Sequence, residues 1–477
     1  MLDLLQRDDA ARQSRPAVVL GRSTLTYGEL GDHVAGVEKS LRHQDKALVL
    51  CSGDRELSTL VAYLAALRTG HVVAFMPATA EVVSAYRPEF VVPGAEGGEG
   101  LDELGYVPAD GGVWRRRAHR PPGDIFPETA VLLTTSGSTG SPKAVRLSYA
   151  GVAGNSAAIV GALGITHADR AATTLPITHS YGLSVVNTHL LAGGSVVLSD
   201  RPPLSLAAWD EMARTGVTSL AAVPTTYSAF GPAHVTLLDR TAIRTMTQSG
   251  ARLPDELTMR LWRMMAQREG RFFVMYGQTE ATARMACLDP ADLPAHLGSV
   301  GVAVPGGTLS IATSAGHHRA RPGEGEVHYA GPGVMLGYAT CRADLRRGAE
   351  VDTLPTGDLG YLRDGHLYLT GRIKRIVKVL GVRTSLDDLE RMVERPGHPT
   401  AVVACADDVV CLVGAGNPEV HEKQRRLLAE TLGVPGRAVV FRAVRRLPRT
   451  GSGKIDYRSL AAVAAGDRCR PGGGEVA

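Results

Sequence analysis

The chain has 477 residues and a mass of 50.3 kDa, which predicts two to four domains or subdomains with a large buried core. A hydrophobic share of 44% and a charged share of 21% exclude a disordered protein and a coiled coil. No stretch approaches the ~18 uninterrupted apolar residues of a membrane span, and the first residues, MLDLLQRDDAARQSR, lack the pattern of a signal peptide. We therefore expect a cytoplasmic protein with no membrane association.

The charge is unevenly distributed along the chain. From Lys374 onward there are 18 basic and 12 acidic residues, whereas 34 basic and 36 acidic residues precede it. A basic C-terminal fifth favours an anionic partner. Because no RNA-binding aromatic motif, zinc finger or long basic helix accompanies it, we expect a small phosphate ligand and no nucleic acid. The six cysteines show no metal-ligand spacing, which favours reduced thiols.

Strand-like and helix-like segments alternate in the N-terminal part. The segment ALVLCSG (47–53) is followed by LSTLVAYLAALRTG (57–70) and then by HVVAFMP (71–77). This strand–helix–strand order predicts an α/β architecture with substantial parallel sheet. Gly70 and Gly193 lie where helices are expected to end. The basic, proline-bearing segment 113–124 is interpreted as a solvated connecting loop.

The C-terminal part changes character. Asp364–Gly365 lies between two alternating runs, which predicts a β-hairpin. A helix is expected within 383–394, capped by Ser385 and presenting Leu386, Leu389 and Met392 on one face. We place a domain boundary near Lys374 and expect the closing segment RCRPGGGEVA to be disordered.

The strongest local signal is VLLTTSGSTGSPKAV (131–145). An apolar strand leads into a loop of Thr, Ser and Gly that ends at Lys143. Glycines allow backbone N–H groups to approach an anion, hydroxyls add donors and the lysine adds charge, which together indicate a phosphate-binding loop. The loop is not a Walker A motif, because Lys143 is not followed by Ser or Thr.

This loop resembles the nucleotide loop of the adenylate-forming superfamily, which includes acyl-CoA synthetases, adenylation domains of peptide synthetases and luciferases. Further motifs resemble the family's in order over roughly residues 20–460: LTYGEL (25–30), PITHSYGL (176–183), QSGARLP (248–254), MYGQTEAT (275–282), PTGDLGY (355–361), GRIKRIVKVLG (371–381) and PRTGSGKID (448–456). A set of short motifs in this order and spacing leaves little room for another family.

The resemblance implies the fold and the reaction. The expected fold is a large α/β N-terminal domain of several subdomains, residues 1–373, with a small mobile α+β C-terminal domain, residues 374–477. The expected reaction has two halves. A carboxylate attacks the α-phosphorus of ATP to give acyl-AMP and pyrophosphate, and after rotation of the C-terminal domain a thiol attacks the acyl-AMP.

The resemblance also implies residue roles. Lys454 corresponds to the catalytic lysine that bridges the carboxylate and the α-phosphate, and His179 to a histidine beside the same groups. Thr279 is expected to donate to the α-phosphate, and Glu280 to hold Mg²⁺, a cation that suits carboxylate and phosphate oxygens. Tyr276 is expected to border the adenine. The other expected ATP contacts are Thr134, Thr135, Ser136, Gly137, Ser138, Thr139, Gly140, Lys143, Gly250, Ala251, Gly277, Gln278, Asp358 (to the ribose) and Arg372.

For the thiol half-reaction, the resemblance implies that Lys374 lies at the hinge. Lys378 and Gly381 correspond to the segment that enters the active site, where Gly381 would leave space for a pantetheine arm. For both lysines the alternative is the exposed face of an edge strand, and their i, i+4 spacing, which places them on one face, fits either interpretation.

The acid pocket is expected around Tyr181, Tyr227 and the Gly250–Ala251 backbone. Gly182 corresponds to the position at which amino-acid adenylation domains place an Asp for the α-ammonium group, so a standard α-amino acid is not expected. Arg284 is interpreted either as a contact for a polar substituent or as a structural arginine. We expect an aromatic or a short- to medium-chain carboxylic acid.

The acceptor and the second step stay open. Only 23 residues follow Lys454, and none resembles a carrier domain, so CoA or a separate carrier protein with phosphopantetheine is expected. The alternatives are an adenylate-forming enzyme with a non-thiol second step, including activation of nitrite for N–N bond formation, and an inactive nucleotide-binding regulator. A regulator would be expected to have lost Lys454, Glu280 or the loop lysine. The sequence gives no indication of the oligomeric state.

Overall fold

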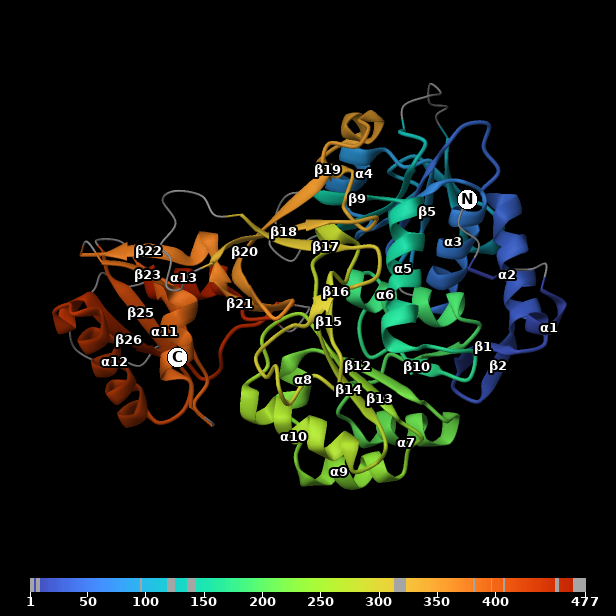
Figure 1. The fold of residues 1–477 in the computed structure, drawn as a ribbon. Helices are drawn as coiled ribbons and strands as arrows, with labels where there is room; N and C mark the ends of the chain where they lie inside the picture. Colours follow the sequence, from blue (N-terminus) through green and yellow to red (C-terminus); the bar gives the residue numbers. More distant parts are fainter. Residues whose placement is uncertain are drawn as a thin grey trace. The chain divides into compact units, whose positions relative to one another are not determined.

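The structure is a computed structural model and describes residues 4–5, 9–94, 97–117, 125–134, 143–312, 323–380, 382–395, 397–405, 408–450 and 454–465. The chain folds into two compact units. The first comprises Met1–Leu309 and Tyr329–Leu354, and the second Ser310–His328 and Pro355–Ala477. Figure 1 shows the mixed α/β fold of each unit, as expected from the sequence. The domain boundary expected near Lys374 falls inside the second unit. The role of Lys374 as a hinge stays a prediction.

The first unit contains a mixed sheet with a parallel centre. Its strands run in the order β16 (Val302–Ala303), β15 (Ala286–Leu288), β14 (Arg271–Tyr276), β13 (Thr245–Gln248), β12 (Ser219–Ala222), β10 (Arg170–Ala172), β11 (Ser195–Leu198), β1 (Pro16–Leu20) and β2 (Ser23–Thr26). The strands from β14 to β1 are parallel, and the edges are antiparallel. The parallel centre agrees with the predicted strand–helix alternation.

A second large sheet carries the predicted phosphate-binding segment. Its order is β19 (Gly337–Ala339), β9 (Ala144–Ser148), β8 (Thr129–Thr134), β4 (Val72–Phe75), β3 (Leu48–Cys51), β5 (Phe90–Val92), β7 (Trp114–Arg116) and β6 (Tyr106–Pro108). The predicted strand–helix–strand segment is confirmed as β3, α3 (Leu57–Arg68) and β4. Segment 113–124 is not a loop throughout, because Trp114–Arg116 pairs with β5 and β6.

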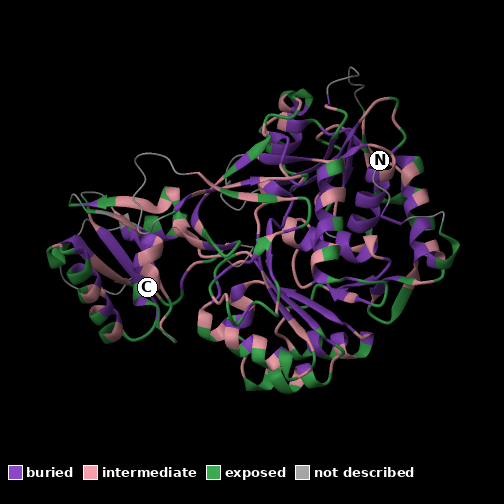
Figure 2. Cartoon of the chain, in the orientation of Figure 1, coloured by how far each residue is buried: buried purple, intermediate pink, exposed green. Residues whose placement is uncertain are grey.

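Helices cover the two sheets of the first unit. They are α1 (Ala10–Gln13), α2 (Tyr27–Ser40), α3, α4 (Ala80–Tyr86), α5 (Tyr149–Leu163), α6 (Ser180–Leu191), α7 (Leu206–Thr215), α8 (Pro224–Ser228), α9 (Pro232–Asp239) and α10 (Asp255–Ala266), with short 3₁₀ turns η1 (Asp110–Gly112), η2 (Thr279–Ala281) and η3 (Arg342–Arg346). Figure 2 shows the buried residues gathered on the strands and on the helices packed against them. As predicted, α3 and α6 end just before Gly70 and Gly193, which have φ of 76° and 75°.

The second unit combines a hairpin sheet with an α+β lobe. The strands β17 (Thr308–Ala312), β18 (Gly325–Ala330), β20 (Thr353–Arg363) and β21 (His366–Arg372) form one sheet. They are followed by η4 (Ile373–Arg375), the pair β22 (Ile376–Val379) and β23 (Val382–Ser385), the three-stranded sheet β24 (Thr400–Ala404), β25 (Val410–Gly414) and β26 (Val439–Ala443), η5 (Gly436–Ala438), and the helices α11 (Leu386–Val393), α12 (Pro418–Leu432) and α13 (Tyr457–Ala465).

Two local predictions in this unit are confirmed, and one needs correction. Asp364 and Gly365 have φ of 52° and 78°, as a tight hairpin requires. The Oγ atom of Ser385 accepts a hydrogen bond from the Asp388 N–H at 3.4 Å and so caps α11. The buried face of α11 contains Leu386, Leu389 and Val393, whereas Met392 is exposed, because the helix turns by 3.6 residues and its face follows the i, i+3, i+7 positions. The segment RCRPGGGEVA lies outside the described residues.

Within the described residues, no helix combines the length and the apolar character that crossing a bilayer requires. Cys51, Cys287, Cys341, Cys405 and Cys411 are free thiols.

Candidate active site

The start of α6 packs tightly against the segment that precedes it. A Cβ atom on Gly182 would lie 2.0 Å from the carbonyl oxygen of Pro176, so only glycine fits at this position. His179 is the residue before the helix, and its carbonyl oxygen accepts a hydrogen bond from the Leu183 N–H at 2.9 Å. The helix from Ser180 to Leu191 contains no acidic residue, so it offers no carboxylate to a bound ammonium group.

The segment MYGQTEAT forms a strained turn between β14 and β15. Thr282 and Ala283 have φ of 66° and 158°, which is unusual for residues other than glycine. A Cβ atom on Gly277 would lie 1.6 Å from the Ala283 carbonyl oxygen. The turn is held by hydrogen bonds from Thr282 Oγ1 to the Gly333 carbonyl at 2.6 Å and from the Met285 N–H to the Tyr276 carbonyl at 2.8 Å.

Side-chain contacts join three of the predicted motifs within the first unit. The hydroxyl oxygens of Ser180 and Thr279 lie 3.2 Å apart, which links PITHSYGL to MYGQTEAT. The Tyr181 hydroxyl lies 2.8 Å from Thr247 Oγ1, directly before QSGARLP. Residues from α6, β13 and the turn after β14 therefore share one region.

Glu280 is held by an aromatic hydroxyl that the sequence did not reveal. Tyr338 donates a hydrogen bond to Glu280 Oε1 at 2.9 Å, and Lys143 Nζ lies 3.6 Å from the centre of the Tyr338 ring. Burial, together with the Glu280 charge, raises the pKa of Tyr338 above its usual range, so the hydroxyl stays a donor. Tyr338 thus connects the predicted phosphate-loop lysine to the predicted magnesium ligand.

This donor set suits Mg²⁺. The described residues hold no group of three or more His, Cys, Asp or Glu side chains that could bind a metal. Mg²⁺ does not need such a group, because it usually binds one or two carboxylates and completes its octahedron with substrate phosphates and water. A carboxylate fixed by Tyr338 beside Lys143 fits that requirement.

The two tyrosines of the predicted acid pocket differ in burial. Tyr181 is partly exposed, and the Cζ atom of Arg284 lies 4.9 Å from the centre of its ring. Tyr227 is fully buried in the hydrophobic core. Its hydroxyl donates to the Thr247 carbonyl at 2.9 Å, and its ring packs against Phe230 and Phe272.

The remaining predicted residues of the first unit lie at the ends of its strands. Thr134 ends β8, Tyr276 ends β14 and is buried, and Gln278 precedes η2. Gly250 has φ of 102°, and the carbonyl of the exposed Ala251 accepts a hydrogen bond from Gln248 Nε2 at 2.6 Å. Thr135, Ser136, Gly137, Ser138, Thr139, Gly140 and Gly381 lie outside the described residues.

The second unit carries the predicted ribose and lysine motifs. Asp358 and Arg372 are cross-strand partners in the β20–β21 hairpin, and Arg372 Nε donates to Asp358 Oδ1 at 2.9 Å. The Lys454 carbonyl accepts a hydrogen bond from the Thr450 N–H at 2.8 Å. Lys374 and Lys378 are both exposed, but Lys374 lies in η4 and only Lys378 belongs to a strand. The alternative in which both lysines lie on one face of an edge strand is therefore wrong, because Lys374 lies in the 3₁₀ turn that precedes the strand.

A partly buried polar cluster lies next to the predicted hinge position. Arg375, next to Lys374, donates to Asp387 at 2.5 Å and to Glu390 at 2.8 Å, and its Cζ atom lies 3.8 Å from the centre of the Tyr457 ring. Tyr457, three residues after Lys454, donates to Glu390 at 2.8 Å. No sequence motif revealed this cluster, because its members come from separate elements.

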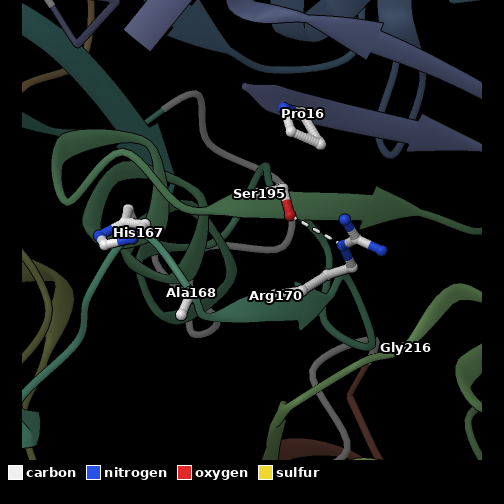
Figure 3. Close-up of a pocket in the computed structure, with 6 residues that line it drawn as sticks. All are labelled: Pro16, His167, Ala168, Arg170, Ser195 and Gly216. Carbon is white, nitrogen blue, oxygen red and sulfur yellow. Dashed lines mark hydrogen bonds between the residues drawn. The ribbon is translucent and has the colours of Figure 1, made fainter. Parts of the chain in front are cut away.

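A separate surface pocket contains none of the predicted site residues. Figure 3 shows its lining of Pro16, His167, Ala168, Arg170, Ser195 and Gly216. Arg170 is already engaged by Ser195, whose Oγ atom accepts from Nε at 2.8 Å.

Comparisons with known proteins identify the family of the chain. The family model for the AMP-binding enzyme matches residues 99–339. The oxalate–CoA ligase of Arabidopsis thaliana is 29% identical over 70% of this chain and 67% of its own length, and the indoleacetate–CoA ligase of Aromatoleum aromaticum is 30% identical over 71% and 68%. The solved structure of o-succinylbenzoate CoA synthetase (MenE) from Bacillus subtilis has a TM-score of 0.75 at 22% identity, covering 96% of this chain and 98% of that one.

The family model spans half of the chain, and the order of the motifs continues into the second unit. The chain therefore belongs to the AMP-binding enzyme family of the adenylate-forming superfamily and is an AMP-forming, acyl-CoA synthetase-like acid–thiol ligase.

Proposed function

We propose that the protein activates an aromatic or a short- to medium-chain carboxylic acid with ATP and transfers the acyl group to the thiol of CoA or of a carrier-protein pantetheine. A carboxylate oxygen attacks the α-phosphorus, and pyrophosphate leaves. The thiol sulfur then attacks the acyl carbon, and AMP leaves with the former carboxylate oxygen. The contact of Ser180 with Thr279, beside the Glu280–Tyr338 pair, is the observation that carries this proposal.

The chemistry requires positive charge and fixed donors, because the first half-reaction brings two anions together. Lys143 and Lys454 provide ammonium groups, and the hydroxyl of Thr279 is positioned by Ser180. Bound to Glu280, Mg²⁺ would neutralise phosphate charge. Asp358, buried and paired with Arg372, would accept the ribose hydroxyls.

Several features support an acid without an α-ammonium group. Gly182 admits no side chain, the whole of α6 lacks a carboxylate, and Arg284 adds a buried positive charge. An ammonium group placed here would lose its water without gaining a counter-charge. The relatives named for oxalate and indoleacetate act on small acids, which agrees with this class.

ATP–pyrophosphate exchange with Mg²⁺ tests the proposal. The panel contains benzoates, cinnamates, short- and medium-chain acids, dicarboxylic acids, amino acids and nitrite. We expect exchange that depends on one class of carboxylic acid. Exchange with amino acids or nitrite alone would overturn the proposed substrate, and binding of ATP without exchange for any acid would favour a nucleotide-binding regulator.

A further inference from the structure

Arg284 is a buried cation without a carboxylate partner among the described residues. Its side chain is only 2% exposed, and neither Nε nor Nη1 has a hydrogen-bond partner. Two other buried arginines of the first unit are paired with carboxylates, Arg342 with Glu89 at 2.9 Å and Arg146 with Glu350. An unpaired buried charge is strongly unfavourable, so the position of Arg284 calls for an explanation.

The backbone around Arg284 is built to keep it in place. The two preceding residues have the strained φ angles of the turn after β14, and Thr282 is anchored to Gly333. The Arg284 carbonyl accepts a hydrogen bond from Asn155 Nδ2 at 2.7 Å, which ties the turn to α5. Strained backbone persists where the surrounding structure enforces it, and such positions cluster at ligand sites.

The groups that face Arg284 leave its charge uncompensated. Its guanidinium lies over the Tyr181 ring, which provides a cation–π contact but no negative charge. The Tyr181 hydroxyl is engaged by Thr247, and α6 contributes no acid. Among the described residues no carboxylate faces the guanidinium, so an anionic group that binds beside Tyr181, in the predicted acid pocket, would supply the counter-charge.

We propose that Arg284 binds a second anionic group of the acid substrate, so that the preferred acid is a small dianion such as a dicarboxylate or a sulfocarboxylate. This inference rests on the proposed function of the same site and adds its specificity. One carboxylate reacts with ATP, and the other anionic group accepts hydrogen bonds from the guanidinium. Arginine suits this task because its planar set of donors matches carboxylate and sulfonate oxygens.

The test is ATP–pyrophosphate exchange with matched acids. Each aliphatic or aromatic dicarboxylate is compared with its monomethyl ester, which has similar size and one charge fewer. Each sulfocarboxylate is compared with the acid that lacks the sulfonate. For the best dianion we expect kcat/KM to exceed that of its partner by at least about 100-fold, because a site built to bind a polar group rejects analogues that lack it.

Variants assign the preference to Arg284. Arg284→Met is expected to reduce the ratio between the dianion and its partner to below about 10, and Arg284→Lys is expected to keep an intermediate ratio. Arg240→Met serves as the matched control, because Arg240 is exposed and pairs with Asp210 on the surface. This control is expected to keep the wild-type ratio.

The outcomes separate this inference from the proposed function. If the best acid carries a single charge, or if Arg284→Met keeps the wild-type ratio, the inference is wrong while acid activation stands. If no acid supports exchange, the proposed function fails and the inference fails with it. If Arg284→Met does not fold, as judged by its melting temperature, the kcat/KM ratios of the wild type and of Arg284→Lys still test the inference.

Discussion

At the scale of single residues, Lys454 carries the largest expected effect on rate. The Lys454 carbonyl accepts a hydrogen bond from the Thr450 N–H, and the Lys454 ammonium group is proposed to stabilise the charge that develops as the carboxylate meets the α-phosphate. Lys454→Ala should lower the rate of ATP–pyrophosphate exchange by about 10²–10³-fold. Lys423→Ala, an exposed position on α12, is the control. Exchange by Lys454→Ala within a few-fold of wild type would remove the assignment.

Tyr338 offers a sharper test of the magnesium site, because it contacts Glu280 without being the proposed ligand. Tyr338→Phe removes the donor and keeps the ring under Lys143. Loss of a hydrogen-bond partner of a metal ligand typically lowers metal affinity by about 10–100-fold. The Mg²⁺ concentration for half-maximal exchange should therefore rise by at least about 10-fold. Tyr361→Phe in the second unit is the control. An unchanged Mg²⁺ requirement in Tyr338→Phe would contradict the role.

His189 predicts a pH dependence of stability. The residue is fully buried in α6, with Nδ1 2.8 Å from the Val185 carbonyl. Burial lowers its pKa to about 4, although the Val185 bond and Asp169 act in the opposite direction. The unfolded chain, with an ordinary pKa of about 6.5, therefore binds the proton first as the pH falls, and stability is lost between these two values.

Across that pH range, the free energy of unfolding is expected to fall by at most about 3–4 kcal/mol. It is measured as the slope of melting temperature against pH from 6.5 down to 4.5. His189→Gln, which cannot be protonated, should have a shallower slope than wild type. Equal slopes in the two proteins would show that His189 does not contribute.

At the scale of elements, the cluster of Arg375, Glu390 and Tyr457 joins η4, α11 and α13. Glu390→Ala leaves the partly buried Arg375 with one of its two carboxylate partners, and we expect it to lower the free energy of unfolding by less than the about 3–5 kcal/mol that breaking a fully buried pair costs. Hydrogen exchange of the β24 and β25 amides should accelerate accordingly. Glu430→Ala, exposed on α12, is the control, and unchanged protection in Glu390→Ala would contradict the proposed support.

Local elements could be predicted where neighbouring residues decide them. The β3–α3–β4 segment, the Asp364–Gly365 hairpin and the Ser385 cap depend on periodicity, turn preference and one side-chain bond within three residues. The error in segment 113–124 arose where distant pairing decides, whereas the Met392 error was a misassigned helix face. Trp114–Arg116 is a strand because β5 and β6 flank it, which no local pattern signals.

The same distinction holds for the site. Lys143, Thr279 and Glu280 were predicted because each lies in a short motif. Tyr338 comes from a strand more than fifty residues later in the chain, so its contact with Glu280 follows only from the fold. The packing of Tyr227 against Phe230 and Phe272 could not be predicted either, because these three residues are brought together only by the tertiary fold.

At the scale of the whole molecule, one chain is proposed to perform two half-reactions that separate variants can distinguish. Gly381→Trp would obstruct the proposed pantetheine path and should slow thioester formation by about 100-fold, an effect typical of a misplaced reactant, with exchange nearly unchanged. Leu206→Trp, on the exposed side of α7, controls for added bulk. Thioester formation at the wild-type rate in Gly381→Trp would contradict the assignment.

The central claim is that a carboxylate oxygen becomes bonded to the α-phosphorus. The most direct measurement uses the preferred acid labelled with ¹⁸O in its carboxylate, together with ATP, Mg²⁺ and a thiol acceptor, and analyses the products by mass spectrometry. We predict one ¹⁸O atom in AMP and none in pyrophosphate, because the bridging oxygen leaves with AMP when the thiol attacks. AMP without the label, or the label in inorganic phosphate with ADP as the other product, would contradict the mechanism.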